Sequence, residues 1–117
     1  MISVRTVQGH QQRYPTAGDW YFTGEIMSVR VSKLNNQDFE FLVGLHEMIE
    51  AYLCRKRGIG EDVVTRFDKA HPDADEPGDM ETCPYRREHQ FAGIIERLMA
   101  NELGVDWYEY EKALGEV

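Results

Sequence analysis

Three side chains that can bind a metal or move a proton, His46, Glu47 and Glu50, lie within one predicted helix. The spacing of apolar residues predicts this helix from about Asp38 to Arg57. At roughly 100° per residue, His46 and Glu50 fall one turn apart within the apolar face, and Glu47 falls at its edge. The surrounding apolar face is predicted to consist of Phe39, Leu42, Leu45, Ile49, Tyr52 and Leu53. A buried imidazole and a buried carboxylate are costly without a partner, so we expect a metal ion, an arginine or each other to satisfy them.

The pattern His46-Glu47-x-x-Glu50 differs by one residue from H-E-x-x-H, in which two residues at i and i+4 bind zinc from one helix face. In that motif the glutamate after the first histidine is the general base that acts on a metal-bound water. A carboxylate also coordinates metals, and two histidines with one glutamate are an accepted zinc ligand set. The chain can assemble this set from His46, Glu50 and His89, with Glu47 as the catalytic base. The ion would be Zn²⁺ or another divalent transition metal such as Mn²⁺.

The third ligand is expected from a helix predicted between Tyr85 and Leu103, which begins after a proline and ends before a glycine. Glu88 is predicted to project into its apolar face, whereas His89 and Glu96 lie together at the edge. We expect His89 to be the ligand, with Glu88 or Glu96 as residues that replace or join it. The apolar face itself is predicted to consist of Phe91, Ile94, Ile95, Leu98 and Met99.

The remaining elements predict an α+β fold, with an N-terminal antiparallel β-hairpin or small sheet packed on three main helices. The turn composition of 15–19 places a hairpin between Gln11–Tyr14 and Trp20–Phe22, with Ile2–Val7 as an earlier part of the same ribbon. Asn35 or Asn36 is expected to cap the first helix, and Gly58 to end it.

Two further helices and an acidic loop complete the prediction. A short helix is expected over Glu61–Ala70, and another around Trp107–Leu114, where Asp106 and Glu109 resemble a capping box. The segment 71–83 is rich in acidic residues and proline, which predicts a solvated loop. Calcium binding by this loop is the alternative, although the spacing matches no EF-hand.

The composition describes one folded domain over residues 1–117, since 42% of the chain is apolar and the length is too short for two cores. A formal charge of −8 disfavours a nucleic-acid partner. No apolar run is long enough to span a membrane, and the N-terminus has no signal-peptide core, so we expect a cytoplasmic protein. The two cysteines fit neither a zinc knuckle nor a disulfide framework.

The order of elements resembles a very reduced zincin metallopeptidase fold: a β-ribbon, a helix that carries the H-E-x-x pattern, and a second helix that supplies another ligand. The resemblance covers roughly residues 20–100 in element order, but only His46 and Glu47 match the motif letters. It implies a metal-dependent hydrolase with one mononuclear site. It also implies a peptide or small-molecule substrate beside the edge of the ribbon. The segments 85–89, 94–97 and 102–107 also resemble small phage and prophage proteins of unassigned activity.

Two other classes of function remain open at this stage. Glu47, Glu50, Glu88 and Glu96 could form a helical di-metal site of the kind found in nucleotide phosphohydrolases, with magnesium or manganese. Alternatively, the protein is a non-catalytic structural or scaffold protein of a phage, in which a buried His–Glu clamp joins the two helices. The sequence leaves the oligomeric state open.

Overall fold

The computed structural model describes residues 1–117 and has an α+β fold, a small sheet followed by four α-helices. The strands are β1 (Ile2–Val7), β2 (Gly18–Thr23) and β3 (Ile26–Ser32). The helices are α1 (Gln37–Lys56), α2 (Glu61–Ala70), α3 (Arg86–Leu103) and α4 (Trp107–Gly115), with the short 3-10 turns η1 (Gly9–Gln11) and η2 (Pro77–Asp79). None of the helices has the length and apolar composition needed to cross a membrane.

The sheet has the strand order β1-β3-β2 and is mixed rather than a simple ribbon. Strands β2 and β3 form the antiparallel hairpin, whereas β1 pairs in parallel with β3. The predicted hairpin turn at 15–19 is therefore wrong, because the chain turns at Gly24, whose φ of +62° is a left-handed conformation that glycine adopts easily. The segment 11–14 is not a strand, and it belongs to the crossover that brings β2 to the far side of β3.

The helix ends follow the predicted local signals. The Asn36 side chain accepts a hydrogen bond from the Phe39 amide at 3.1 Å, and Asp106 accepts one from the Glu109 amide at 3.0 Å. Gly58 and Gly104 have φ values of +74° and +70°, the left-handed conformation that ends many helices. Short-range capping chemistry therefore sets the limits of α1, α3 and α4.

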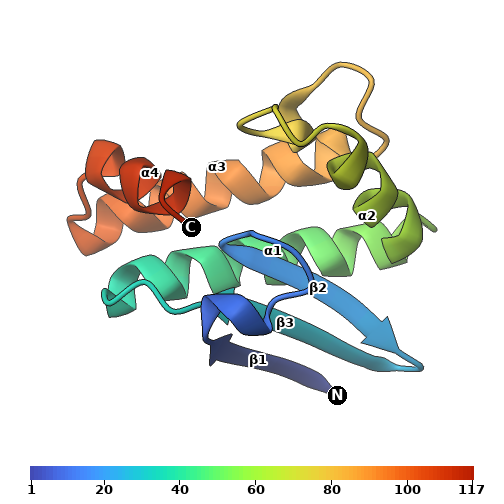
Figure 1. The fold of residues 1–117 in the computed structure, drawn as a ribbon, viewed down its shortest axis with the longest axis horizontal. Coiled ribbons are helices and arrows are strands. Elements are labelled where there is room, and N and C mark those ends of the chain that lie inside the picture. The colour runs from blue at the N-terminus through green and yellow to red at the C-terminus, as the bar shows by residue number, and fades with distance from the viewer.

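Helix α1 is the central element of the fold, because it packs on the sheet with one side and on α3 with another (Figure 1). The core between these layers includes Trp20, Met27, Val29, Val31, Leu42, Val43, Ala51, Cys54 and Tyr110. Both cysteines are buried and free. Residues that α1 buries toward α3 are therefore shielded from solvent by two layers of structure.

The buried face of α3 differs from the prediction. Phe91, Ile94 and Leu98 are 48%, 58% and 64% exposed, whereas the buried residues of this helix are Glu88, Ala92, Glu96 and Ala100. The small side chains of the two alanines let α3 lie close to its neighbours. The buried glutamates have polar partners: Arg57, just after α1, pairs with Glu88, and His46 on α1 and Tyr110 on α4 bond Glu96. On α1, likewise, Leu42 is fully buried but Tyr52 is 56% exposed. Polar pairing, rather than the largest apolar side chains, decides which face of α3 points inward.

Candidate metal centre

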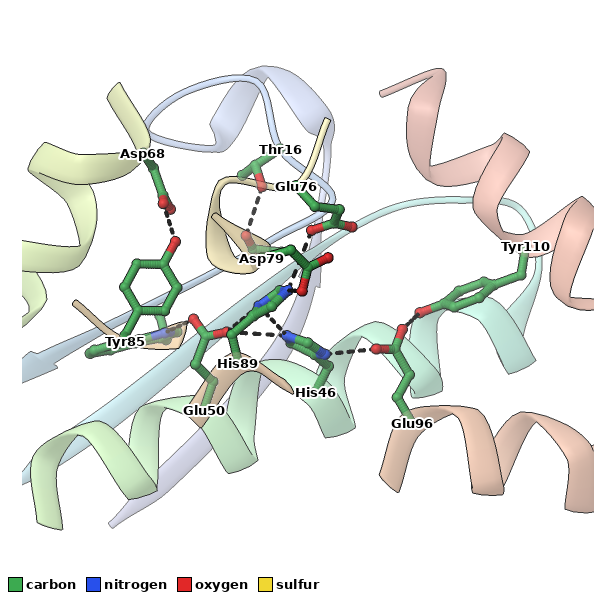
Figure 2. Close-up of polar contacts among 12 residues, drawn as sticks. Thr16, His46, Glu50, Asp68, Glu76, Asp79, Tyr85, His89, Glu96 and Tyr110 are labelled. Carbon is green, nitrogen blue, oxygen red and sulfur yellow. Dashed lines mark hydrogen bonds and ion pairs between the residues drawn. The ribbon is translucent and has the colours of Figure 1, made fainter. Parts of the chain in front are cut away.

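Helices α1 and α3 bring His46, Glu50 and His89 together into a group that could hold a metal ion. His46 and Glu50 project from successive turns of α1, and His89 reaches them from the first half of α3 (Figure 2). The His46 Nε2 atom lies 3.1 Å from Glu50 Oε2 and 3.2 Å from His89 Nδ1. The His89 Nδ1 atom lies 2.9 Å from Glu50 Oε2, which closes the triangle. All three residues that the sequence predicts as ligands therefore meet at one point.

The size of this triangle suits a small divalent ion. Ligand atoms ~2.0 to 2.1 Å from a tetrahedral zinc lie roughly 3.3 Å from one another. The three separations, 2.9, 3.1 and 3.2 Å, are close to that value. Two imidazole nitrogens and one carboxylate oxygen also form a ligand set that zinc accepts. The donors need to move apart by only a few tenths of an ångström to hold the ion.

A hydrogen-bonded chain behind His46 fixes which of its nitrogens faces the site. Glu96 Oε1 lies 2.6 Å from His46 Nδ1, so this nitrogen carries the proton and donates it to the carboxylate. The other oxygen of Glu96 accepts a hydrogen bond from the Tyr110 hydroxyl at 2.5 Å (Figure 2). In neutral His46 the lone pair of Nε2 is then directed at the other two ligand atoms. Carboxylate–histidine pairs of this kind orient metal ligands and increase their basicity.

The other two ligands are also held from behind. The indole nitrogen of Trp20, on β2, donates to Glu50 Oε1 at 3.0 Å, which leaves Oε2 directed at the histidines. His89 Nε2 lies 3.6 Å from carboxylate oxygens of both Glu76 and Asp79, on and beside η2. Each ligand therefore has a partner that favours one orientation.

Packing against η2 further restricts the His89 ring. A Cβ atom at Gly78 would lie 2.4 Å from His89 Cγ, so only glycine lets the backbone approach the ring this closely. The predicted solvated loop is thus partly a wall of the site, although Glu76 and Asp79 remain more than half exposed. The loop alone contains no group that could hold a metal ion, which disfavours the calcium-loop alternative.

The charges of the three ligands depend strongly on one another. Burial lowers the pKa of His46, but hydrogen bonds to Glu50 and Glu96 outweigh it and raise that pKa well above its usual value. Burial likewise opposes protonation of His89, and Glu50 raises its pKa. Burial would raise the pKa of Glu50, but its hydrogen bonds with the two histidines lower it to about 2. Protons thus stabilise the cluster when no metal ion is bound, and a metal ion would replace them.

Glu47, the predicted catalytic base, lies on the side of α1 that faces β2. A Cβ atom at Gly18 would lie 2.6 Å from Glu47 Cγ and 2.9 Å from its Oε1, so the strand passes directly over this side chain. No hydrogen bond or ion pair engages its carboxylate. Burial raises the pKa of Glu47 well above its usual range, and the charge of Glu50 raises it further. A free carboxylate beside the ligands is compatible with the predicted role, which stays a prediction.

The structure separates the four glutamates of the di-metal alternative. Glu88 forms an ion pair with Arg57 at 2.7 Å, and Glu96 is held by His46 and Tyr110. Neither belongs to a group that could hold a metal ion. Among the three candidates on α3, only His89 therefore reaches the site as a ligand, and Glu96 supports it from behind.

Sequence reasoning missed four residues that shape the site, namely Trp20, Glu76, Asp79 and Tyr110. In the sequence, Trp20 and Tyr110 have the character of core aromatics. Only their N–H and O–H groups, which need acceptors when buried, indicate a polar partner.

Nearby, Asp68 accepts a hydrogen bond from Tyr85, and burial raises the pKa of that carboxyl to about 6. Asp68 is not one of the ligands.

Comparison with known proteins gives no match to a protein-family model, a curated protein or a solved structure.

Proposed function

We propose that the protein is a metal-dependent hydrolase with one mononuclear site, held by His46, Glu50 and His89. The observation that carries the proposal is the convergence of the three ligand atoms within 2.9–3.2 Å of one another. The partners behind the ligands support it, because Glu96 and Trp20 orient His46 Nε2 and Glu50 Oε2 toward the same point. Zinc is the ion that this donor set favours, with manganese as the alternative.

The proposed division of roles follows the positions of the side chains. A bound zinc ion would supply Lewis acidity, which polarises a carbonyl and lowers the pKa of water. Glu47 would take the proton from the attacking water, because its carboxylate is free of protein partners and lies between α1 and β2. Glu96 would keep the Nδ1 proton on His46, so that Nε2 remains a ligand. The chain order also supports the proposal: a sheet, then α1 with the H-E-x-x pattern, then α3 with His89 is the order of elements that resembles a reduced zincin.

The surroundings of β2 suggest the size of the substrate. β2 is an edge strand and is the one closest to Glu47, so a peptide could in principle extend the sheet there. However, the Gly18 carbonyl already accepts from the Thr16 hydroxyl at 2.8 Å, and the Trp20 carbonyl accepts from Arg13 at 3.3 Å. These contacts cover part of the edge. We therefore propose that the substrate is a short peptide or a small molecule with a hydrolysable amide or ester bond.

Elemental analysis together with a cleavage assay tests the proposal. Purified protein should contain close to one equivalent of zinc or manganese, and the loaded protein should cleave members of a short-peptide and ester library detected by mass spectrometry. Glu47→Gln should keep the metal and lose cleavage, since it removes a base but no ligand. Glu50→Ala should lose the metal. Protein that takes up no metal from solution would leave the site as a hydrogen-bonded clamp between helices and would refute the proposal.

A further inference from the structure

Strand β1 is the open edge of the sheet. The strand order β1-β3-β2 leaves one side of β1 unpaired, and no other element lies beyond it (Figure 1). The carbonyls of Met1 and Val7 accept hydrogen bonds from β3, at 3.0 and 2.9 Å. Because the main-chain groups of successive strand residues point to alternate sides, Ile2, Val4 and Thr6 direct their N–H and C=O groups to the open side. Such an edge is a template for another strand.

The side chains on this part of β1 face α1 but do not cover it. A Cβ atom at Gly44 would lie 3.4 Å from Val4 Cγ1, so the strand and the helix are in contact there. Ile2 lines an apolar hollow of about 240 Å³, together with Met27, Met48, Ile49, Tyr52 and Leu53. Ile2 and Val4 are nevertheless 54% and 48% exposed, and Tyr52 is 56% exposed. Helix α1 therefore extends past the sheet on the β1 side, where a fourth strand would cover it.

The hollow and an exposed aromatic side chain lie at opposite ends of this surface. Ile2 lies beside Met48 in the hollow, whereas Val4 lies beside Gly44, so α1 runs antiparallel to β1. Phe41 is seven residues before Met48 and therefore on the same stripe of the helix. It lies one turn before Gly44, toward the C-terminal end of β1, and is 51% exposed.

A second copy of β1 fits this edge in one register. In an antiparallel pair centred on Val4, that residue pairs with its own copy, and Ile2 pairs with Thr6 of the second copy. All the outward-facing residues then exchange N–H and C=O bonds, about six in total. Arg5, the only charged side chain of the strand, lies opposite Ser3 of the second copy. A pair centred on Thr6 or on Ile2 would join fewer outward groups, and one centred on Arg5 would place two arginines opposite each other.

The same two-fold axis covers the hollow. It turns the end of one copy that bears Phe41 toward the end of the other copy that bears the hollow. Phe41 and Tyr52 are both about half exposed, so at ~200 Å² for a whole aromatic side chain they contribute roughly 200 Å² per copy. Met1, Ile2, Val4 and the strand backbone add to this area. The interface therefore lies at the small end of specific interfaces, and we expect the dimer to dissociate on dilution.

We infer that the protein forms a two-fold symmetric homodimer in which the β1 strands pair antiparallel about Val4. The two sheets join into one sheet of six strands, three from each copy. Both α1 helices then lie on the same face of the joined sheet, and their exposed stripes face each other. The opposite edge, β2, is partly covered by Thr16 and Arg13, so the sheets join at β1. A contact that is complementary to itself is what a two-fold interface requires.

Sedimentation velocity over a dilution series tests the dimer. The native chain should reach twice the protomer mass at high concentration and dissociate on dilution. Phe41→Glu places a charge over the apolar hollow of the second copy, so it should weaken the dimer at least about tenfold. Phe91→Glu is the matched control, because Phe91 is 48% exposed on α3, away from β1, and should leave the dimer unchanged. Circular dichroism should show native folding in both variants.

Cysteine cross-linking tests the register. Val4→Cys places two thiols on the axis with Cα atoms ~5.5 Å apart, so mild oxidation should give a covalent dimer. Thr6→Cys alone should give none, because its two copies are about 13 Å apart along the strands. A mixture of Thr6→Cys and Ile2→Cys should cross-link. The native cysteines are buried, and the unmodified chain should show no cross-link.

Three results would overturn the inference. A native chain that stays monomeric at every concentration would leave the edge of β1 to an extended segment of another protein. A Phe91→Glu variant as weak as Phe41→Glu would place the contact elsewhere. Cross-linking of Thr6→Cys to itself, or its absence in both Val4→Cys and the mixture, would exclude the pairing about Val4.

Discussion

Replacing Glu96 with glutamine should weaken metal binding without removing a ligand. The Glu96 carboxylate is only 7% exposed and accepts hydrogen bonds from His46 Nδ1 at 2.6 Å and from the Tyr110 hydroxyl at 2.5 Å. Glutamine keeps the shape but loses the charge, and it has one acceptor oxygen for two donors. If its amide nitrogen faces His46, the imidazole must move its proton to Nε2, which then cannot bind a metal. Losing a carboxylate partner of a histidine ligand typically costs 10–100-fold in metal affinity.

The expected change is therefore a fall of about 10–100-fold in zinc affinity, equivalent to roughly 1.4–2.7 kcal/mol. Competition titration against a chromophoric chelator measures this difference directly. Glu88→Gln is the matched control, because Glu88 is equally buried at 4% exposure and lies on the same helix, but pairs with Arg57 instead. Tyr110→Phe should give a smaller loss, since it removes only one hydrogen bond to Glu96.

Two results would refute this reasoning. One is a Glu96→Gln variant with native zinc affinity, which would mean that the hydrogen bond to His46 does not control the ligand. The other is a Glu88→Gln variant that loses as much affinity, which would reduce the effect to a general loosening of α3. Because both glutamates are buried, a comparison of thermal melts without metal separates damage to the fold from damage to the site.

Three further outcomes are expected. A chelator should lower the melting temperature of the native protein and have little effect on His89→Ala; an unchanged native melt would count against bound metal. The chelator effect should be larger at pH 8 than at pH 6. Protonated His46 stabilises the metal-free fold. This contribution is complete below about pH 6.5, the usual histidine pKa, and it is lost as the pH rises through the raised pKa of His46. A chelator effect that shrinks with rising pH would contradict this sign. His46→Ala should destabilise the fold by about 3 kcal/mol, because it removes the partner that the two buried carboxylates Glu50 and Glu96 share. His10→Ala, at an exposed position, should melt like the native protein, and equal melts for both variants would argue against a buried site.

Local signals in the sequence determined the helices and half of the site. A capping side chain such as Asn36 and a glycine such as Gly104 act within a few residues, so helix limits could be predicted without any tertiary contact. His46 and Glu50 share a face because helical periodicity is also local. His89 could be chosen from the sequence on chemical grounds, since it completes a set of two histidines and one carboxylate, whereas Glu88 or Glu96 would place two carboxylates at one buried point.

Only the tertiary structure decided how distant segments meet. The parallel pairing of β1 with β3 depends on a crossover, which short-range turn composition does not encode. The apolar stripe around Ile94 is equally compatible with a core and with an interface, because periodicity reports a face but not what covers it. In the folded protein α3 is oriented with His89 and Glu96 toward α1, because buried charged groups need partners whereas apolar side chains tolerate exposure to solvent. Trp20 and Tyr110 joined the site for the same reason: each is far from the ligands in sequence and carries a buried donor that only a folded neighbour can satisfy.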